Sequence, residues 1–342
     1  DGDGQPLLEI VSSGDVTLND LVLTNSVRDG YGGAVFNDGG VLTATSCVFA
    51  ANEVTGTNAN GFGGALFNAA DGAMTLYDCA FNANVARFGG AVYIQGTVGL
   101  FDCSFSENSA RWGGGVYVQN GTTILQDVDF ENNTAVEEGG AVFNQGTLTV
   151  KGSTFRGNAA ENDGGALWSN GTMSMNASVW FNNTAVLGGA LMHEGAITNM
   201  VDCTYEQNSA SDKGGAIYVQ EGSLSMTECH LIENDAVNGG GVYTEDGVVT
   251  MAECHLMENR AVIGGGVYHE NGGVSMVETH CTCNNASIGS VMYSQTMGQV
   301  IVEGGSAYAP YASNIFEPPL IGANVTTMLA GYCPICRYIG EN

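Results

Sequence analysis

The sequence predicts an all-β solenoid, a right-handed single-stranded parallel β-helix of about eleven coils with roughly 25 residues in each coil. The observations behind this prediction are a glycine pair that recurs once per coil, an aromatic-x-x-Asn motif halfway between pairs, and short alternating apolar runs. Because each coil of a solenoid buries its apolar side chains against its neighbours, a chain of 342 residues fits one repeat domain.

Each glycine pair is followed by a small residue, an aliphatic residue and usually an aromatic one. The pairs lie 24 to 31 residues apart and begin at Gly32, Gly63, Gly89, Gly113, Gly139, Gly164, Gly188, Gly214, Gly239 and Gly264, with an eroded copy at Gly289. Paired glycines before an alternating run break helices and suit turns that lead into strands. Each pair therefore marks the start of a strand.

The second motif places an aromatic or aliphatic residue three positions before an asparagine. Its asparagines are Asn52, Asn84, Asn108, Asn133, Asn158, Asn183, Asn208, Asn234 and Asn259. Asparagine tolerates left-handed backbone and bonds to neighbouring main-chain groups. Stacked once per coil, these side chains are expected to form an Asn ladder that satisfies turn groups which no strand reaches.

The alternating runs place one row of apolar residues inside the solenoid. Eight positions before the ladder asparagines stand Leu76, Leu100, Leu125, Val150, Met175, Met200, Met226, Met251 and Met276. The methionines are expected to pack the core, although a metal or cofactor track is the alternative. A parallel row holds Cys47, Cys79, Cys103, Cys203, Cys229 and Cys254, which we expect inside as free thiols rather than in disulfides between coils.

Composition restricts the partners of the chain. With 36 acidic and 8 basic side chains, its formal charge of −28 argues against binding to nucleic acid or to an anionic membrane surface. The sequence has no apolar run long enough to span a bilayer. We expect protein partners or further copies of the chain, and possible glycan ligands, with no nucleic acid and no membrane-spanning segment.

The interleaved G-G-A-V-F and F-x-x-N motifs resemble the repeat of the chlamydial polymorphic outer membrane proteins, over about residues 10 to 295. This resemblance implies a β-helix that is displayed at a cell surface and associated with adhesion. It implies no catalytic residues. We expect residues 1–299 to form the repeat domain and residues 300–342 to form a non-repetitive C-terminal cap or partner-joining segment.

Acidic residues recur one position before the cysteine row, as Asp78, Asp102 and Asp127 and again as Asp202, Glu228, Glu253 and Glu278. Like charges one strand apart repel, so this row belongs on a solvated face, where it either keeps the rod soluble or binds Ca²⁺. In the last coils the row is joined by His230, His255 and His280. Carboxylates and imidazoles on adjacent strands can bind Zn²⁺ or a similar ion. The four acidic residues from Asp202 to Glu278 and the three histidines are therefore a candidate metal site.

In the strand that follows each glycine pair, an aliphatic residue comes directly before the aromatic one, so the two side chains point to opposite faces of the strand. If the aliphatics face inward, the aromatics form an exposed stripe that could bind a glycan or a neighbouring subunit; with reversed parity they belong to the core. We expect the outward arrangement. The candidate binding stripe in the last coils consists of Tyr218, Tyr243, Tyr268 and Tyr293.

Four cysteines lie outside the cysteine row, near the C-terminal end: Cys281, Cys283, Cys333 and Cys336. We expect disulfides that pin a C-terminal cap, with a zinc site of four thiolates as the alternative. Candidate glycosylation sequons include Asn120 and Asn170, both in N-G-T at expected loop tips, and Asn324. Both features favour a secreted, extracellular or cell-surface chain.

The function expected from these features is a non-enzymatic surface protein, either an adhesin or a structural subunit of a surface filament or coat. A polysaccharide lyase or hydrolase is the first alternative, but such enzymes need clustered cations or a carboxylate pair in a cleft. Basic residues are few, and five of them (Arg28, Arg87, Arg111, Lys213 and Arg260) fall just before glycine pairs, on one turn of the rod. A cation-binding matrix protein is the second alternative, and it rests on the acidic row.

Overall fold

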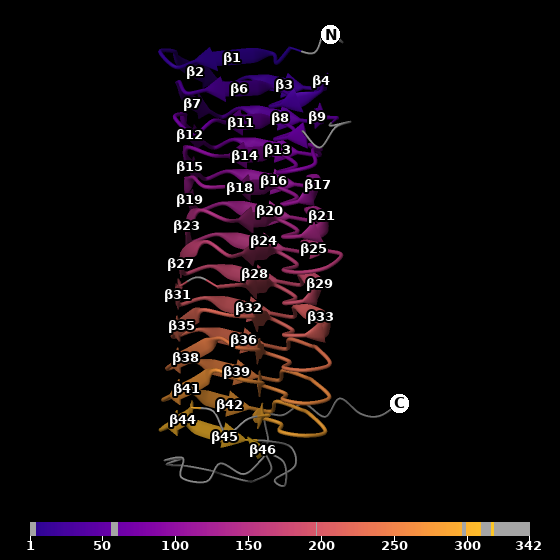
Figure 1. Cartoon of the computed structure of the whole chain (residues 1–342), viewed down its shortest axis with the longest axis vertical. Helices are drawn as coiled ribbons and strands as arrows, with labels where there is room; N and C mark the ends of the chain where they lie inside the picture. The colour runs from indigo at the N-terminus through magenta and orange to yellow at the C-terminus, as the bar shows by residue number, and fades with distance from the viewer. Residues whose placement is uncertain (1–4, 56–60, 196, 296–298, 309–315, 318–342) are drawn as a thin grey trace.

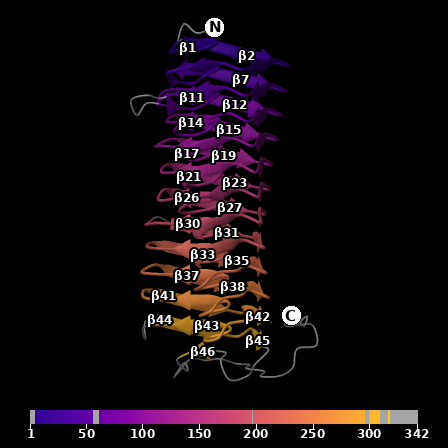
Figure 2. The same ribbon diagram turned by 90° about the vertical axis from the view of Figure 1, so that its right-hand side faces the viewer.

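The computed structural model describes residues 5–55, 61–195, 197–295, 299–308 and 316–317. Within these residues the protein contains 46 β-strands and no helix. The strands stack as a long rod whose coils follow one another from the N-terminal to the C-terminal end (Figures 1 and 2). Every strand pairs in parallel with the equivalent strand of the next coil. The all-β solenoid predicted from the repeat is confirmed.

Three long sheets run along the rod. Sheet 1 has thirteen strands, in the order β1 (Leu8–Val11), β6 (Val35–Asp38), β11 (Leu66–Asn68), β14 (Val92–Ile94), β18 (Val116–Val118), β22 (Val142–Asn144), β26 (Leu167–Ser169), β30 (Leu191–His193), β34 (Ile217–Val219), β37 (Val242–Thr244), β40 (Val267–His269), β43 (Met292–Ser294) and β46 (Phe316–Glu317). It contains the strands that follow the glycine pairs.

Sheet 2 contains the alternating strands and runs along the left edge of the rod in Figure 1. It has twelve strands, in the order β2 (Asp15–Asn19), β7 (Val41–Thr45), β12 (Ala73–Tyr77), β15 (Thr97–Phe101), β19 (Thr122–Gln126), β23 (Thr147–Lys151), β27 (Thr172–Asn176), β31 (Ile197–Val201), β35 (Ser223–Thr227), β38 (Val248–Ala252), β41 (Gly273–Val277) and β44 (Gln299–Glu303).

Sheet 3 contains the aromatic residues of the aromatic-x-x-Asn motif. It has twelve strands, in the order β3 (Val22–Thr24), β8 (Val48–Ala50), β13 (Ala80–Asn82), β16 (Ser104–Ser106), β20 (Asp129–Glu131), β24 (Thr154–Arg156), β28 (Val179–Phe181), β32 (Thr204–Glu206), β36 (His230–Ile232), β39 (His255–Met257), β42 (His280–Thr282) and β45 (Ser306–Tyr308).

A fourth, shorter sheet lies between the ladder asparagines and the glycine pairs. Sheet 4 has five strands, β17 (Ser109–Trp112), β21 (Thr134–Glu138), β25 (Ala159–Ala160), β29 (Thr184–Leu187) and β33 (Ser209–Lys213). Two further pairs continue the same segment in the first coils, β4 (Val27–Arg28) with β9 (Glu53–Val54) and β5 (Gly30–Tyr31) with β10 (Gly61–Phe62). The sequence motifs do not predict this sheet.

The glycine pairs allow the tight turn that starts each strand of sheet 1. Gly139 adopts a left-handed backbone with φ of 67°, and a Cβ at this position would lie 2.3 Å from the carbonyl oxygen of Val142. A Cβ on the next residue, Gly140, would lie 2.0 Å from the carbonyl oxygen of Gly165 in the following coil. A side chain therefore fits at neither position of the pair.

The Asn ladder predicted from the second motif is present, with every member buried. The Oδ1 atom of Asn158 accepts hydrogen bonds from the backbone N–H and the Nδ2 group of Asn133, both at 3.0 Å. Its own Nδ2 group donates to the carbonyl oxygen of Phe130 at 3.1 Å. The same pattern repeats from Asn52 to Asn284, which adds one member to the predicted ladder. Each ladder asparagine thus joins its own coil to its neighbours.

Inside the rod, the apolar rows predicted from parity pack against one another. The aromatic residues of sheet 3 form a continuous stack with ring centroids 3.9 to 5.6 Å apart: Phe49, Phe81, Phe105, Phe130, Phe155, Trp180 and Tyr205. The Leu and Met row is buried in the same core. The cysteine row is also buried, and all six of its thiols are free, as predicted.

The strands continue beyond the boundary that was expected at residue 299. β44 pairs with β41 in register, and β45 pairs with β42. The repeat therefore extends to at least Tyr308, with β46 added to sheet 1. The rest of the expected C-terminal cap, residues 309–315 and 318–342, lies outside the described residues.

We predict that Asn158→Ala destabilises the protein by about 3 kcal/mol or more, because the change leaves the backbone N–H of Asn133 and the carbonyl of Phe130 buried without these partners. Chemical denaturation followed by circular dichroism measures this difference. Asn199→Ala is the matched control, since Asn199 is exposed on sheet 2, and its expected effect is within about 0.5 kcal/mol. Equal effects of the two changes would contradict a structural role for the ladder.

Candidate functional site

The tyrosine stripe points away from the core but is not exposed along its length. The aromatic residues that follow the glycine pairs form an apolar cluster separate from the interior core, so the predicted outward direction is right. Tyr218 and Tyr243, however, are each only 2% exposed, while Tyr268 and Tyr293 are half-buried. The expectation of an exposed stripe is therefore wrong for Tyr218 and Tyr243.

The reason is a second layer of side chains, which we call the cover row. It consists of the residue just before each glycine pair: Tyr31, Phe62, Phe88, Trp112, Glu138, Asp163, Leu187, Lys213, Asn238, Ile263 and Ile288. Phe62 packs edge-on against Tyr93, with ring centroids 4.8 Å apart, and Phe88 packs in the same way against Tyr117 at 5.5 Å. Backbone pairing in sheet 4 holds the row in register over the aromatic stripe.

Polar groups complete the cover in the later coils. The Lys213 ammonium lies 4.7 Å from the ring centroid of Tyr243. The hydroxyl of Tyr218 donates to Glu245, and that of Tyr243 donates to Glu270. Burial and these neighbouring carboxylates raise the pKa of both tyrosines above its ordinary value. The stripe therefore serves the packing of a second layer rather than presenting free rings along the rod.

In the middle of the rod, the cover row changes from aromatic to acidic. Glu138 and Asp163 occupy the next two coils after Trp112, are half-buried, and pair with each other through their backbones. Burial raises the pKa of Glu138 to about 7, with further contributions from Asp163, Glu137 and Glu194. Burial and Glu194 raise the pKa of Asp163 to about 6. Two half-buried carboxylates with raised pKa values are typical of functional sites, although structural clusters show them as well.

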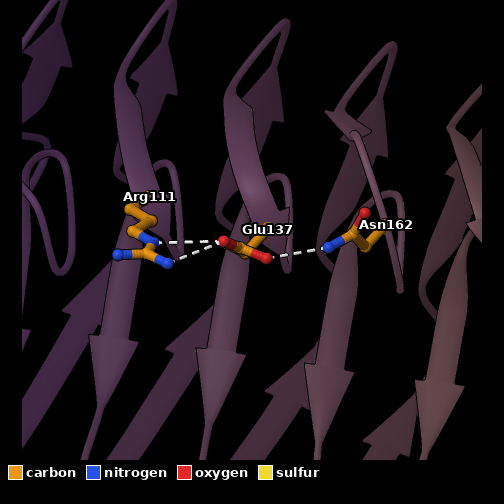
Figure 3. Close-up of polar contacts among 3 residues, drawn as sticks. All are labelled: Arg111, Glu137 and Asn162. Atoms are coloured by element: carbon orange, nitrogen blue, oxygen red, sulfur yellow. Dashed lines mark hydrogen bonds and ion pairs between the residues drawn. The ribbon is translucent and has the colours of Figure 1, made fainter.

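A neighbouring chain of polar contacts holds sheet 4 together at this point. Figure 3 shows Arg111, Glu137 and Asn162 in line across successive coils. The Arg111 guanidinium donates to Glu137 at 2.9 Å, and the Asn162 side chain donates to the same carboxylate at 2.8 Å. The guanidinium also lies 4.3 Å from the ring centroid of Trp112. The basic residues expected on one turn thus include one that pairs with an acid of the next coil.

Glu138 and Asp163 are not among the candidate site residues that the sequence predicts. Their only signal in the sequence is an acidic residue just before a glycine pair, where the preceding coils have Tyr31, Phe62, Phe88 and Trp112. That substitution becomes informative only once the cover layer is known. The pair is therefore a site that the fold reveals.

The predicted metal residues do meet along one open groove of about 440 Å³, which we call the Glu–His groove. Its lining consists of Asp202, Glu228, His230, Glu253, His255, Glu278 and His280. The carboxylates are exposed corner residues with left-handed backbone, placed between sheets 2 and 3, as the solvated face predicted for the acidic row requires. The histidines lie on β36, β39 and β42, one per coil.

The histidine rings stack along the groove. Ring centroids of His230 and His255 are 4.9 Å apart, and those of His255 and His280 are 5.1 Å apart. Burial and the two flanking imidazoles lower the pKa of His255, and His280 shares a hydrogen bond with Ser306 at 2.8 Å. The groove therefore combines four carboxylates with three stacked imidazoles, and the central imidazole, His255, is harder to protonate than an ordinary histidine.

No metal-binding group is formed in this arrangement. In the part of the chain that the structure describes, no three His, Cys, Asp or Glu side chains are grouped closely enough to hold a metal ion. The physical reason is spacing: equivalent residues lie about 4.8 Å apart, one per coil, whereas ligands of one ion must converge on a single point. The seven side chains line up along the groove, but they do not converge on a single point, as the binding of Zn²⁺ or Ca²⁺ would require.

The C-terminal cysteines differ from the prediction in one respect. Cys281 is a free thiol that is 1% exposed, and it occupies the aromatic position of the motif that ends at Asn284. It belongs to the core, so neither a disulfide cap nor a zinc site of four thiolates includes it. Cys283 is disulfide-bonded, and its partner lies outside the described residues. Cys333 and Cys336 also lie outside them.

The predicted sequons are accessible where the structure describes them. Asn120 and Asn170 are exposed in the turns between sheets 1 and 2. Asn324 lies outside the described residues. Attachment of a glycan to any of these residues stays a prediction.

Comparison with known families agrees with this geometry. The family model of the right-handed beta helix region matches residues 8–186, just over half of the chain. The chain belongs to the right-handed β-helix family. The model of the Chlamydia polymorphic membrane protein repeat matches residues 206–220 of this β-helix, a segment that includes Asn208 of the ladder and the glycine pair at Gly214. The resemblance drawn from the two motifs is thereby confirmed.

No curated protein and no solved structure matches the chain significantly. Among the described residues, no helix has the length and apolar character that crossing a membrane requires. The family comparison thus identifies the β-helix and its repeat, while the ligand and partner of this β-helix are matters for proposal.

We predict that Glu138→Gln stabilises the β-helix at about pH 8 by roughly 1–2 kcal/mol, after allowance for solvent screening of a half-buried carboxylate. The pKa of Glu138 is raised from 4.5 to about 7 on folding, so its favourable contribution is present below its unfolded pKa and lost as pH rises through about 7. The advantage of glutamine should therefore vanish at about pH 4.

Denaturation curves at both pH values measure this effect, with Glu161→Gln as the control because Glu161 is an exposed carboxylate of the same segment. An advantage of Glu138→Gln that is equal at both pH values would show that the buried charge is not its cause.

Proposed function

We propose that this β-helix is a non-enzymatic extracellular or cell-surface protein that acts through its exposed faces, as an adhesin or as a structural subunit of a surface filament or coat. The observation that carries the proposal is the match of residues 206–220 to the Chlamydia polymorphic membrane protein repeat. The family description names a polymorphic membrane protein of Chlamydia, and this supports display of the β-helix at a cell surface.

The form of the molecule supports a role in contact rather than in chemistry. Coils stacked in register offer long, regular surfaces, as is typical of solenoids that bind partners along a face. The Glu–His groove is open, and its residues repeat from coil to coil instead of converging on one reactive point. A charge of −28 favours cationic or neutral partners.

A polysaccharide hydrolase is the second candidate, because Glu138 and Asp163 form a half-buried carboxylate pair. Hydrolases of this class use one protonated and one ionised carboxyl group. Arg111, in the coil before Glu138, is already paired with Glu137. A glycan ligand at this segment would fit either candidate.

We expect antibodies against the folded β-helix to label intact cells that produce the full chain, and brief protease treatment of those cells to remove the signal. Permeabilised cells serve as the control for total protein. Labelling that appears only after permeabilisation would contradict the proposal. Release of reducing sugars from a polysaccharide panel by the wild type, absent from Glu138→Gln, would favour the hydrolase instead.

A further inference from the structure

The outward face of sheet 2 between β7 and β41 differs from the rest of this acidic molecule. We call it the neutral face. Its strands alternate inward apolar residues with outward ones, which gives three outward positions in each of ten strands. Of these thirty positions fourteen are Ser or Thr, ten are Ala, Val, Ile, Phe or Tyr, and the only charged residue is Lys151.

This face also carries a large share of the exposed apolar side chains. They are Val41 (46% exposed), Tyr77 (43%), Ile124 (39%), Ile197 (61%), Val201 (40%), Val248 (45%) and Val277 (36%). They are spread over strands β7 to β41 of sheet 2, the sheet that runs along the left edge of the rod in Figure 1. Exposed apolar side chains that share one face are typical of interaction surfaces.

Net charge decides what can dock here. Two copies of a chain with a charge of −28 repel each other at most approaches, and the neutral face is where that repulsion is least. An anionic partner has a single cation, Lys151, to bind on this face, and a small glycan finds a flat sheet rather than a concave pocket. A second neutral face, by contrast, matches it in flatness, polarity and length.

The size of the face is that of a stable interface. Five residues per strand at about 3.3 Å each, over ten strands at about 4.8 Å, give about 800 Å². Specific protein–protein interfaces bury about 800 Å² on each partner. The neutral face is therefore large enough for a dimer without any other surface.

We infer that two copies of this β-helix associate side by side through their neutral faces. The inference rests on the proposed contact function and deepens it, because it names the face and the partner. Apolar side chains such as Ile124 and Ile197 leave water on association, and the Ser and Thr hydroxyls pair across the interface or through bridging water.

Sedimentation equilibrium of the purified full chain at physiological salt tests the inference. We expect the wild type to be a dimer at micromolar concentration and Ile124→Glu to be monomeric. The dissociation constant of the dimer should rise at least tenfold in Ile124→Glu, because the change places two extra negative charges in the interface. Val179→Glu is the matched control: Val179 is also 39% exposed but lies on β28 in sheet 3, and this variant should remain a dimer.

Thermal unfolding of both variants checks that each is folded. A wild type that stays monomeric up to about 100 µM, far above the usual range of stable dimers, would overturn the inference. So would a dimer that survives Ile124→Glu, or a glycan found by mass spectrometry on Asn176, a sequon residue exposed on β27 of this face. Loss of cell attachment in Ile124→Glu with a monomeric wild type would mean that the face binds a different partner.

The labelling of intact cells separates this inference from the proposed function. Cells that display the chain while the purified protein is monomeric would retain the surface role and exclude self-association. Dimers in solution without labelling of intact cells would retain self-association and exclude the surface role.

Discussion

The structure depends on the hydrogen bonds of the Asn ladder. Each ladder asparagine is buried at a corner where the chain leaves sheet 3, and its amide bonds to the coils on both sides. Because the Oδ1 atom accepts from both a backbone and a side-chain N–H, a slip of one residue would leave several buried groups without partners. The ladder therefore fixes the register of each coil on the next. As a result, all remaining positions of the repeat also stack in rows along the rod.

Stacking in rows determines what kinds of sites this β-helix can have. A row concentrates one chemical type along a line, such as the carboxylates of the Glu–His groove or the hydroxyls of the neutral face. It does not bring different residues to a point, which explains why seven potential ligands line a groove without forming a metal centre. Extended, repetitive contact is the function that such rows support.

The sequence predicted the architecture well, because period and parity are local properties of the chain. The glycine pairs, the Asn ladder, the inward methionines and the free inward cysteines follow from counting positions. The cover row could not be predicted in the same way: the segment from Asn133 to Gly139 has no strong alternation, and its pairing in sheet 4 depends on neighbouring coils. Strand alternation alone therefore predicts Tyr218 and Tyr243 at the surface and gives no sign of Glu138 and Asp163. Cys281 takes the aromatic position of the last motif, so the sequence alone does not show that it belongs to the core.

Hydrogen exchange of the corner amides tests the role of the ladder most directly. The backbone N–H groups of Asn133, Asn158 and Asn183 donate to side-chain oxygens, not to strand carbonyls. If the ladder holds the coils in register, these amides exchange as slowly as those within sheet 3, since both open only when coils separate. Exchange at the rate of exposed turn amides would contradict the account, because it would show that the coils stay stacked without the ladder.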